Sequence, residues 1–232
     1  MGGTTERPRG RAELLAFIAG DPALAALRDE VAARDAAGPD AAHDLEHSLR
    51  VALWTLRCGP ELPARLAVAT ALLHDAVRVP KHHPDRPQAG ELSAEHAGER
   101  LRALGFAPAE AAAAAAAIRD HGFSRGAEPA GPLGRALQDA DRLDALGAVG
   151  LARLFATGAA MGAAFFDPDD PWARRRALDD RSRSVDHFFT KLLRLPGLMR
   201  TEAGRREAGA RVRLLRDYLA ALGRELEEPP PE

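Results

Sequence analysis

The feature that most constrains this chain is an apolar stretch that ends in a histidine and an aspartate. Residues 66–73 are almost entirely apolar and lead directly into His74 and Asp75. Burying an ionisable pair costs several kcal/mol unless something compensates the charge. A bound cation is the simplest compensation. The stretch therefore predicts a metal site whose other ligands lie elsewhere in the chain.

Two other segments carry side chains that can complete such a site. Each segment is compatible with a helix and rich in histidine or acidic residues. They contain His43, Asp44, Glu46 and His47 before the apolar stretch, and Asp139, Asp141 and Asp144 after it. Three separated helices can converge on one ion inside a helical bundle, so the pattern predicts a metal site in a bundle core.

The composition favours an all-α protein. Alanine is abundant and aromatic residues make up only 5% of the 232 residues, which suits close helix packing better than β-sheets. A hydrophobic content of 46% is sufficient for a sizeable core. We expect a flexible N-terminus over residues 1–11, one domain over residues 12–225 and a disordered tail over residues 226–232.

Charge and cysteine content argue against several classes of protein. The net charge of −2 gives no basic surface for duplex nucleic acid or a membrane. Cys58, the single cysteine, cannot form a disulfide within the chain. No apolar run approaches the roughly 20 residues that cross a bilayer, and residues 1–11 lack the apolar core of a signal peptide. We therefore expect a cytoplasmic monomer or homodimer without nucleic-acid or membrane partners.

Proline, glycine and capping residues divide the chain into predicted helices. Asp21 and Pro22, for example, combine an N-cap with a proline at the first helical position. The predicted helices cover residues 12–19 and 22–37, a segment carrying His43 and His47, and residues 64–75, 91–104, 109–121, 133–157, 180–195 and 198–225. Residues 79–90 contain three prolines and form a predicted active-site loop.

Four of these side chains resemble a known family signature. His47 lies in His-Ser-Leu-Arg-Val, the His74-Asp75 pair in Leu-Leu-His-Asp, and Asp141 in Asp-Ala-Asp-Arg-Leu. In order and context they resemble the H…HD…D signature of the HD-domain phosphohydrolase superfamily. The resemblance implies an all-α HD-domain helical bundle with a central metal site.

Further motifs are similar to the small bacterial YedJ/YpgQ-like branch of that superfamily. They are His43-Asp44, Lys81 with His83-Pro84, His121-Gly122-Phe123-Ser124, residues 138–150, His187-Phe188 with Lys191-Leu192-Leu193, and Met199 to Thr201 leading to Gly204. For part of the branch this implies a divalent-metal-dependent pyrophosphohydrolase of nucleoside triphosphates. The chain departs from the pattern at Gly122, where a small hydroxyl residue is expected. Arg78 stands where a related group of monophosphatases carries a catalytic carboxylate.

The resemblance implies that His47, His74, Asp75 and Asp141 bind one divalent metal ion. Two neutral imidazoles and two carboxylates suit Mn²⁺, Co²⁺, Ni²⁺ or Fe²⁺ better than Mg²⁺, which typically prefers a shell made only of oxygen ligands. Mg²⁺ remains an alternative. Such an ion has positions left for a phosphate oxygen and for a water whose pKa it lowers. We expect this water to attack an α-phosphate and release pyrophosphate, with Asp75 as both ligand and catalytic residue.

Three other residues have a functional and a structural interpretation. Lys81 and His83 can bind the polyphosphate or protonate a leaving oxygen, or else lie in a solvated loop. His121 can donate to a phosphate, join a second metal, or cap its helix. We treat all three as candidate catalytic and substrate-binding residues.

Three residues further along the chain are candidate substrate-binding residues. Around the helix axis, Asp144 lies closer to the direction of Asp141 than Asp139 does. We therefore expect Asp144 to reach a water or a sugar hydroxyl, and Asp139 to be an N-cap. Arg142 contacts phosphate or pairs with a neighbouring aspartate. Lys191 reaches the pocket from a late helix or lies on a solvated face.

The leading functional hypothesis is a (d)NTP pyrophosphohydrolase that gives a monophosphate and pyrophosphate. A phosphatase or phosphodiesterase acting on another small phosphoester is the first alternative. The second is a di-iron HD oxygenase, which needs further histidine ligands. The third is a nucleotide-binding module without catalysis. Base and sugar preference and the metal used in the cell stay open.

Overall fold

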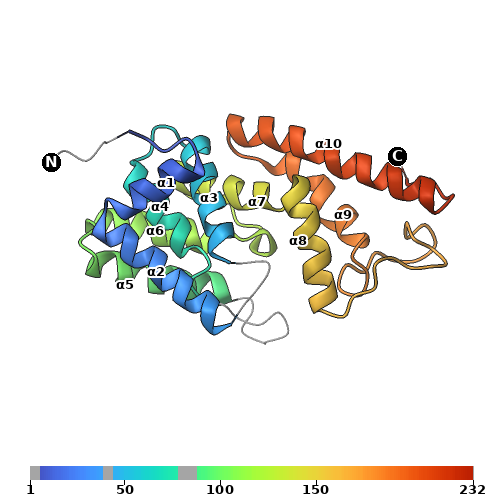
Figure 1. Cartoon of the computed structure of the whole chain (residues 1–232), viewed down its shortest axis with the longest axis horizontal. Coiled ribbons are helices and arrows are strands. Elements are labelled where there is room, and N and C mark those ends of the chain that lie inside the picture. Colours follow the sequence, from blue (N-terminus) through green and yellow to red (C-terminus); the bar gives the residue numbers. More distant parts are fainter. Residues whose placement is uncertain (1–5, 39–43, 78–87, 232) are drawn as a thin grey trace. The chain divides into compact units, whose positions relative to one another are not determined.

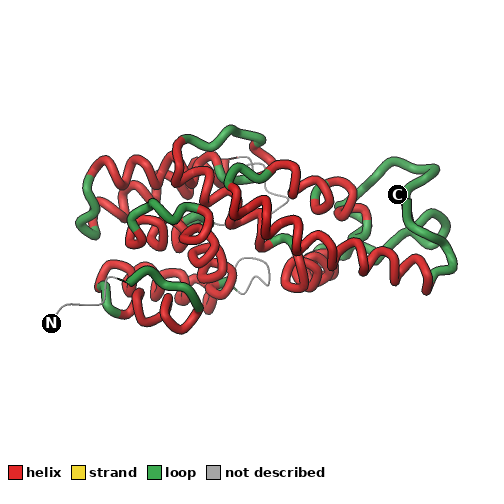
Figure 2. Tube along the Cα trace, turned by 90° about the horizontal axis from the view of Figure 1, so that it is seen from above, coloured by secondary structure: helices red, strands yellow, loops and turns green. Residues whose placement is uncertain are grey.

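The computed structural model describes residues 6–38, 44–77 and 88–231, and these residues form helices joined by loops. Within these ranges there is no β-strand, and the strand-like pairing found there is an isolated bridge between Ala164 and Arg183 (Figure 2). The predicted all-α class is confirmed. In the same ranges no single helix is long and apolar enough to cross a membrane, although the helices Gly131–Asp144 and Gly147–Ala160 together reach that length and composition as a bent pair.

The chain divides into two compact units, Met1–Asp141 and Arg142–Glu232. The described helices of the first unit are α1 (Arg11–Ala19), α2 (Pro22–Ala37), α3 (Leu45–Cys58), α4 (Ala64–Leu73), α5 (Ala89–Ala103), α6 (Pro108–Asp120) and the short η2 (Phe123–Arg125). The helix α7 (Gly131–Asp144) completes this unit and runs three residues into the second. The second unit contains α8 (Gly147–Ala160), α9 (Asp186–Thr190), η3 (Leu192–Leu198) and α10 (Glu202–Glu225).

The helix α4 is the centre of the first unit. It contacts α2, α3, α5 and α6, and Figure 1 shows it among these helices. Every residue from Leu66 to Leu73 is buried. A helix enclosed on all sides must be apolar on nearly all sides, which explains the apolar stretch. The one hydroxyl within it, on Thr70, donates to the Leu66 carbonyl. The chain leaves this enclosed helix at His74, so the first polar groups after α4 are held at the interior of the unit.

Side-chain contacts define where the first helices begin and end. The Asp21 carboxylate accepts from the backbone N–H groups of Ala23 and Leu24 at the start of α2. The Asp44 carboxylate accepts from the N–H of His47 at 2.7 Å, so α3 begins at Leu45. The predicted third helix includes His43, which lies outside the described residues. The cap directs the first turn of α3, which carries His47.

The predicted helix over residues 133–157 is wrong, because two helices replace it. The helix α7 ends at Asp144, and α8 begins at Gly147 after the extended residue Leu146. Gly147 has a φ of +74°, a conformation that glycine adopts without steric cost. A Cβ on Gly150 would lie 2.2 Å from the backbone of Ala145, so the turn also needs glycine there.

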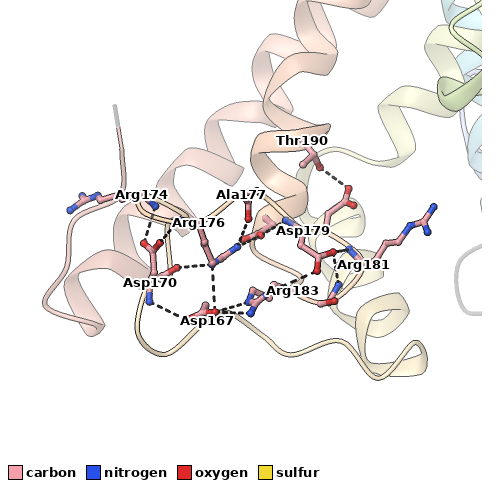
Figure 3. Close-up of polar contacts among 12 residues, drawn as sticks. Asp167, Asp170, Arg174, Arg176, Ala177, Asp179, Arg181, Arg183 and Thr190 are labelled. Atoms are coloured by element: carbon pink, nitrogen blue, oxygen red, sulfur yellow. Dashed lines mark hydrogen bonds and ion pairs between the residues drawn. The ribbon is translucent and has the colours of Figure 1, made fainter.

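The predicted helix over residues 180–195 is also wrong, because α9 begins only at Asp186. Aspartate and arginine side chains hold the preceding loop in an irregular path, and Figure 3 shows them pointing toward one another across it. The Asp170 carboxylate accepts from three consecutive backbone N–H groups, those of Arg174, Arg175 and Arg176. Such side-chain to backbone bonds compete with the helical hydrogen-bond pattern.

One ionic cluster predicts a pH-dependent contribution to stability. Glu30 on α2 accepts from His96 Nε2 at 2.9 Å and from Arg100 Nε at 2.8 Å, both on α5. Burial by itself raises the pKa of Glu30, but the hydrogen bonds from Arg100 and His96 outweigh it and leave this pKa below 4.5. A lowered carboxyl pKa stabilises the folded state above the unfolded value, and the contribution is lost as the pH falls through the folded value.

We therefore expect Glu30→Gln to lower the free energy of unfolding by less than about 1 kcal/mol at about pH 7, since the cluster is partly exposed. The difference should shrink as the pH falls below 4.5. Urea unfolding of both proteins at neutral and acid pH measures it. Glu99→Gln, a substitution of an exposed glutamate on α5, is the control. An equal difference at both pH values would contradict the assignment.

Candidate metal centre

Five histidine and aspartate side chains of the first unit converge on one place. His47 comes from the first turn of α3, and His74 with Asp75 directly follows α4. His121 directly follows α6, and Asp141 lies in the last turn of α7. The three imidazoles are buried, and the two carboxylates are partly exposed. The cluster therefore has a buried nitrogen side and an accessible oxygen side.

The donor atoms of the cluster lie close together. His47 Nε2 is 3.1 Å from His74 Nε2 and 3.6 Å from Asp141 Oδ1. Asp75 Oδ2 is 3.3 Å from His74 Nε2 and 3.9 Å from His47 Nε2. His121 Nε2 is 3.9 Å from Asp75 Oδ1. The separations between neighbouring donor atoms thus run from 3.1 to 4.0 Å across the five residues.

These separations fit ligands arranged around one cation. Two donors about 2.1 Å from a common ion lie about 3 Å apart at right angles and about 4.2 Å apart on opposite sides. Two overlapping groups meet the condition for a metal site, His47 with His74 and Asp141, and His74 with Asp75 and His121. His74 belongs to both groups. The arrangement can hold a metal ion, and its mixed nitrogen and oxygen donors are those that first-row divalent metals prefer.

The same local device orients His74 and His121. Each residue is the C-cap of its helix and lies within 2.7 Å, through Nδ1, of the carbonyl oxygen three residues earlier, that of Ala71 or Ile118. A carbonyl only accepts, so Nδ1 carries a hydrogen, and in the neutral imidazole Nε2 keeps its lone pair. In both residues it is Nε2 that faces the cluster. The fold thus sets the tautomer that a metal requires.

The charges of the cluster favour a positive charge at its centre. Burial lowers the pKa of His74, but the carboxylates of Asp75 and Asp141 outweigh it and raise this pKa to about 9. Burial raises the pKa of Asp141, but His121, His47 and His74 outweigh it and leave this pKa lowered. Two carboxylates that attract a proton so strongly offer the same attraction to a metal cation.

The structure brings together all four predicted metal ligands, and it adds His121. We expected His121 to donate to a phosphate, to join a second metal, or to cap its helix. The capping contact is present through Nδ1, and Nε2 is turned to Asp75 at the same time. His121 is therefore within reach of the metal ligands without giving up its structural contact.

The remaining predicted site residues fall into two groups. Lys81 and His83 are outside the described residues, as are His43 and Arg78. In the second unit Arg142 is buried and donates to the Leu198 carbonyl at 2.6 Å, while Asp144 is buried against Arg153. Lys191 follows α9, and its N–H donates to the His187 carbonyl. The substrate roles assigned to these residues stay predictions.

The prediction that Asp139 is an N-cap is wrong. Asp139 lies inside α7, eight residues after its start, and is fully buried. The helix begins at Gly131 because Gly131 has a φ of +66°, which sets the entry turn. One contact of the site had no prediction at all. Gln138, three residues before Asp141, donates to the peptide carbonyl that precedes His121.

Comparison with known proteins assigns this fold and cluster to a class. The family model described as "HD domain" matches residues 44–146, which contain all five residues of the cluster. The chain is 32% identical over 190 residues to the uncharacterized protein YpgQ of Bacillus subtilis, which covers 79% of this chain and 84% of YpgQ. The chain belongs to the HD domain family, in the branch that contains YpgQ.

Solved structures support this assignment. The crystal structure of Bacillus subtilis YpgQ in complex with ADP is similar with a TM-score of 0.64 and 28% identity, over 87% of this chain and 93% of that one. An HD-superfamily hydrolase from Bacillus thuringiensis is similar with a TM-score of 0.65 and 27% identity, over 92% of this chain and 98% of that one. The structural relatives of this chain thus include proteins named as HD-superfamily hydrolases.

Proposed function

We propose that the chain is a metal-dependent nucleotide phosphohydrolase, specifically a pyrophosphohydrolase of (d)NTPs. The observation that carries this proposal is the cluster of five histidine and aspartate donors with separations of 3.1 to 4.0 Å. His47, His74, Asp75 and Asp141 would hold one divalent ion, with Mn²⁺, Co²⁺, Ni²⁺ or Fe²⁺ favoured over Mg²⁺. Bound there, the ion would polarise a phosphoryl group and lower the pKa of a water.

The nucleotide part of the proposal rests on a relative. Bacillus subtilis YpgQ was crystallised in complex with ADP, and this chain shares its fold over most of its length. ADP carries a phosphoanhydride bond, as a triphosphate does. The reaction proposed here adds one water across the bond between the α-phosphorus and its bridging oxygen, and it yields a monophosphate and pyrophosphate.

The chain's own residues divide this work between them. The buried imidazoles of His47 and His74 serve as metal ligands, and the partly exposed carboxylate of Asp75 serves as both a ligand and the candidate catalytic group. His121, whose Nε2 lies near Asp75, either donates to a phosphate oxygen or binds a metal ion together with His74 and Asp75. Lys81 and His83 neutralise the charge that develops on the leaving pyrophosphate. Arg142, Asp144 and Lys191 are proposed to bind the nucleotide.

Restoring metal to stripped protein tests this function. We expect pyrophosphate release from NTPs or dNTPs only after Mn²⁺, Co²⁺ or Ni²⁺ is added, because the ligand set requires a cation for activity. The measurement follows phosphate and pyrophosphate separately over triphosphates, monophosphates and cyclic dinucleotides. Orthophosphate from monophosphates, or a linearised cyclic dinucleotide, would instead identify a phosphatase or a phosphodiesterase. Tight metal binding without turnover on any substrate would favour a nucleotide-binding module.

The position of His121 also favours a second candidate, a di-iron HD oxygenase. That chemistry needs histidine ligands beyond the four-residue signature, and His121 forms a second donor group with His74 and Asp75. Iron content and oxygen dependence distinguish the two candidates. Two iron atoms per chain together with oxygen consumption would support the oxygenase, and one metal per chain with oxygen-independent hydrolysis would support the pyrophosphohydrolase.

A further inference from the structure

Gln138 is a buried polar residue that the proposed chemistry does not use. Its side chain is fully buried on α7, three residues before Asp141. Residues three apart differ by about 60° around a helix axis, so Gln138 and Asp141 share one face of α7. A buried amide needs hydrogen-bond partners that justify its desolvation.

The partners of Gln138 are the two ends of the segment that contains His121. Gln138 Nε2 donates to the carbonyl of Asp120 at 3.1 Å and to the carbonyl of Ala127 at 3.3 Å. The Asp120 carbonyl belongs to the peptide group that leads into His121. It is also one of the last carbonyls of α6, which have no partner inside their own helix. One amide group therefore closes the turn over residues 121–126 against α7.

The orientation of the amide is determined by these two carbonyls. Rotating the amide by half a turn would place Oε1 against two oxygens, and oxygens cannot donate. In the present orientation Oε1 is buried and accepts no hydrogen bond from the described residues. A buried acceptor without a donor lowers stability. An apolar side chain of the same size would avoid that loss, but it would leave the Asp120 and Ala127 carbonyls without this donor. The glutamine therefore adds little net stability, and what it provides is a fixed position for the segment that contains His121.

We propose that Gln138 is a positioning residue that holds His121 at the metal centre. His121 is fixed at two points, its own Nδ1 on the Ile118 carbonyl and the preceding peptide group on Gln138. Because Gln138 and Asp141 lie on one face of α7, the helix that supplies one ligand also holds the segment that supplies His121. This inference rests on the metal centre of the proposed function, but not on its substrate.

The test compares Gln138→Met with wild-type full-length protein after removal of metal. Methionine has a similar length and no amide, so it removes both donated bonds while keeping the volume. We expect the affinity for Mn²⁺, measured by titration calorimetry, to fall about tenfold, the lower end for groups that orient metal ligands. Amide hydrogen exchange of residues 121–127 in the metal-free protein should become faster, while the urea midpoint should change little, because the lost hydrogen bonds and the removed unpaired Oε1 offset each other.

A double-mutant cycle separates positioning from a general loss of packing. If Gln138 acts through His121, its substitution in a His121→Ala background should have little further effect on Mn²⁺ affinity. Leu137→Met, an equally buried substitution on α7, is the matched control and should leave exchange of residues 121–127 unchanged. Multiplicative losses in the double mutant, or equal effects of Gln138→Met and Leu137→Met, would overturn the proposal.

A second substitution keeps the test decisive if Gln138→Met does not fold. Gln138→Glu retains the shape but places carboxylate oxygens against the two carbonyls, so exchange of residues 121–127 should again become faster. Unchanged exchange in Gln138→Glu would overturn the proposal as well. Nucleotide turnover is not among these measurements. The role of Gln138 can therefore be tested even if the protein hydrolyses no nucleotide. A negative result for Gln138 would not contradict the proposed function.

Discussion

Replacing His74 with alanine is expected to abolish metal binding and to reduce metal-dependent turnover by at least about 1,000-fold. His74 is fully buried and belongs to both donor groups of the cluster, so its loss removes a ligand from each. It also removes an imidazole that stabilises the negative charges of Asp75 and Asp141, which repel each other. Losing several kcal/mol of charge stabilisation corresponds to this factor, since 1.36 kcal/mol is tenfold in rate.

The measurement combines calorimetric titration of metal with turnover under saturating metal. His96→Ala provides the matched control, because His96 lies in the same unit and pairs with Glu30 away from the cluster. Its metal affinity should stay within about twofold of wild type. If His74→Ala and Asp75→Ala both kept full metal-dependent turnover, the assignment of the metal centre would be wrong.

Replacing Asp186 with alanine is expected to lower the free energy of unfolding of the second unit by about 3 kcal/mol. Asp186 is fully buried, and Arg176 donates to its two oxygens at 2.5 and 2.8 Å. The N–H of Asp179 donates to the same carboxylate at 2.7 Å. Removing the carboxylate leaves the mostly buried guanidinium with the Asp170 and Ala177 carbonyls and the more distant carboxylate of Asp167, at 3.5 Å. The free energy of unfolding falls because the desolvated Arg176 guanidinium loses its main carboxylate partner.

Trp172 reports on this unit, because it is buried and its Nε1 donates to the Glu228 carbonyl at 2.7 Å. Urea unfolding followed by Trp172 fluorescence in a Trp54→Phe background measures the change. Asp217→Ala, which removes an exposed aspartate on α10, should shift the midpoint little. A shift no larger for Asp186→Ala than for Asp217→Ala would show that the Arg176 pair does not hold the loop.

Several elements of the fold were predictable because their signals are local. Asp21 with Pro22 marks the start of α2, and the nearly continuous apolar stretch over residues 66–73 marks the enclosed α4. The break between α7 and α8 was missed because the positive φ of Gly147 overrides a pattern that is otherwise helical on both sides. Helical periodicity continues across such a turn, so periodicity alone cannot detect it.

The loop before α9 was missed for a different reason. Residues 180–185 have the spacing of a helix, but Asp179 and Asp186 are engaged by backbone and arginine groups of the loop itself. These bonds join residues up to ten positions apart, and a helix would break them. The helix propensity of residues 180–185 is therefore outweighed by hydrogen bonds that form only when the loop is folded.

The sequence by itself determined the all-α class and the identity of the four signature residues, His47, His74, Asp75 and Asp141. Their types, their order and their apolar sequence surroundings can be read from the chain itself. An ionisable residue within an apolar segment stands out because its burial is costly unless a partner compensates its charge. Only the tertiary structure decided that His121 faces Asp75 and that Gln138 holds its segment. Hydrogen bonds to backbone carbonyls leave no trace in residue identity, because every residue provides the same carbonyl.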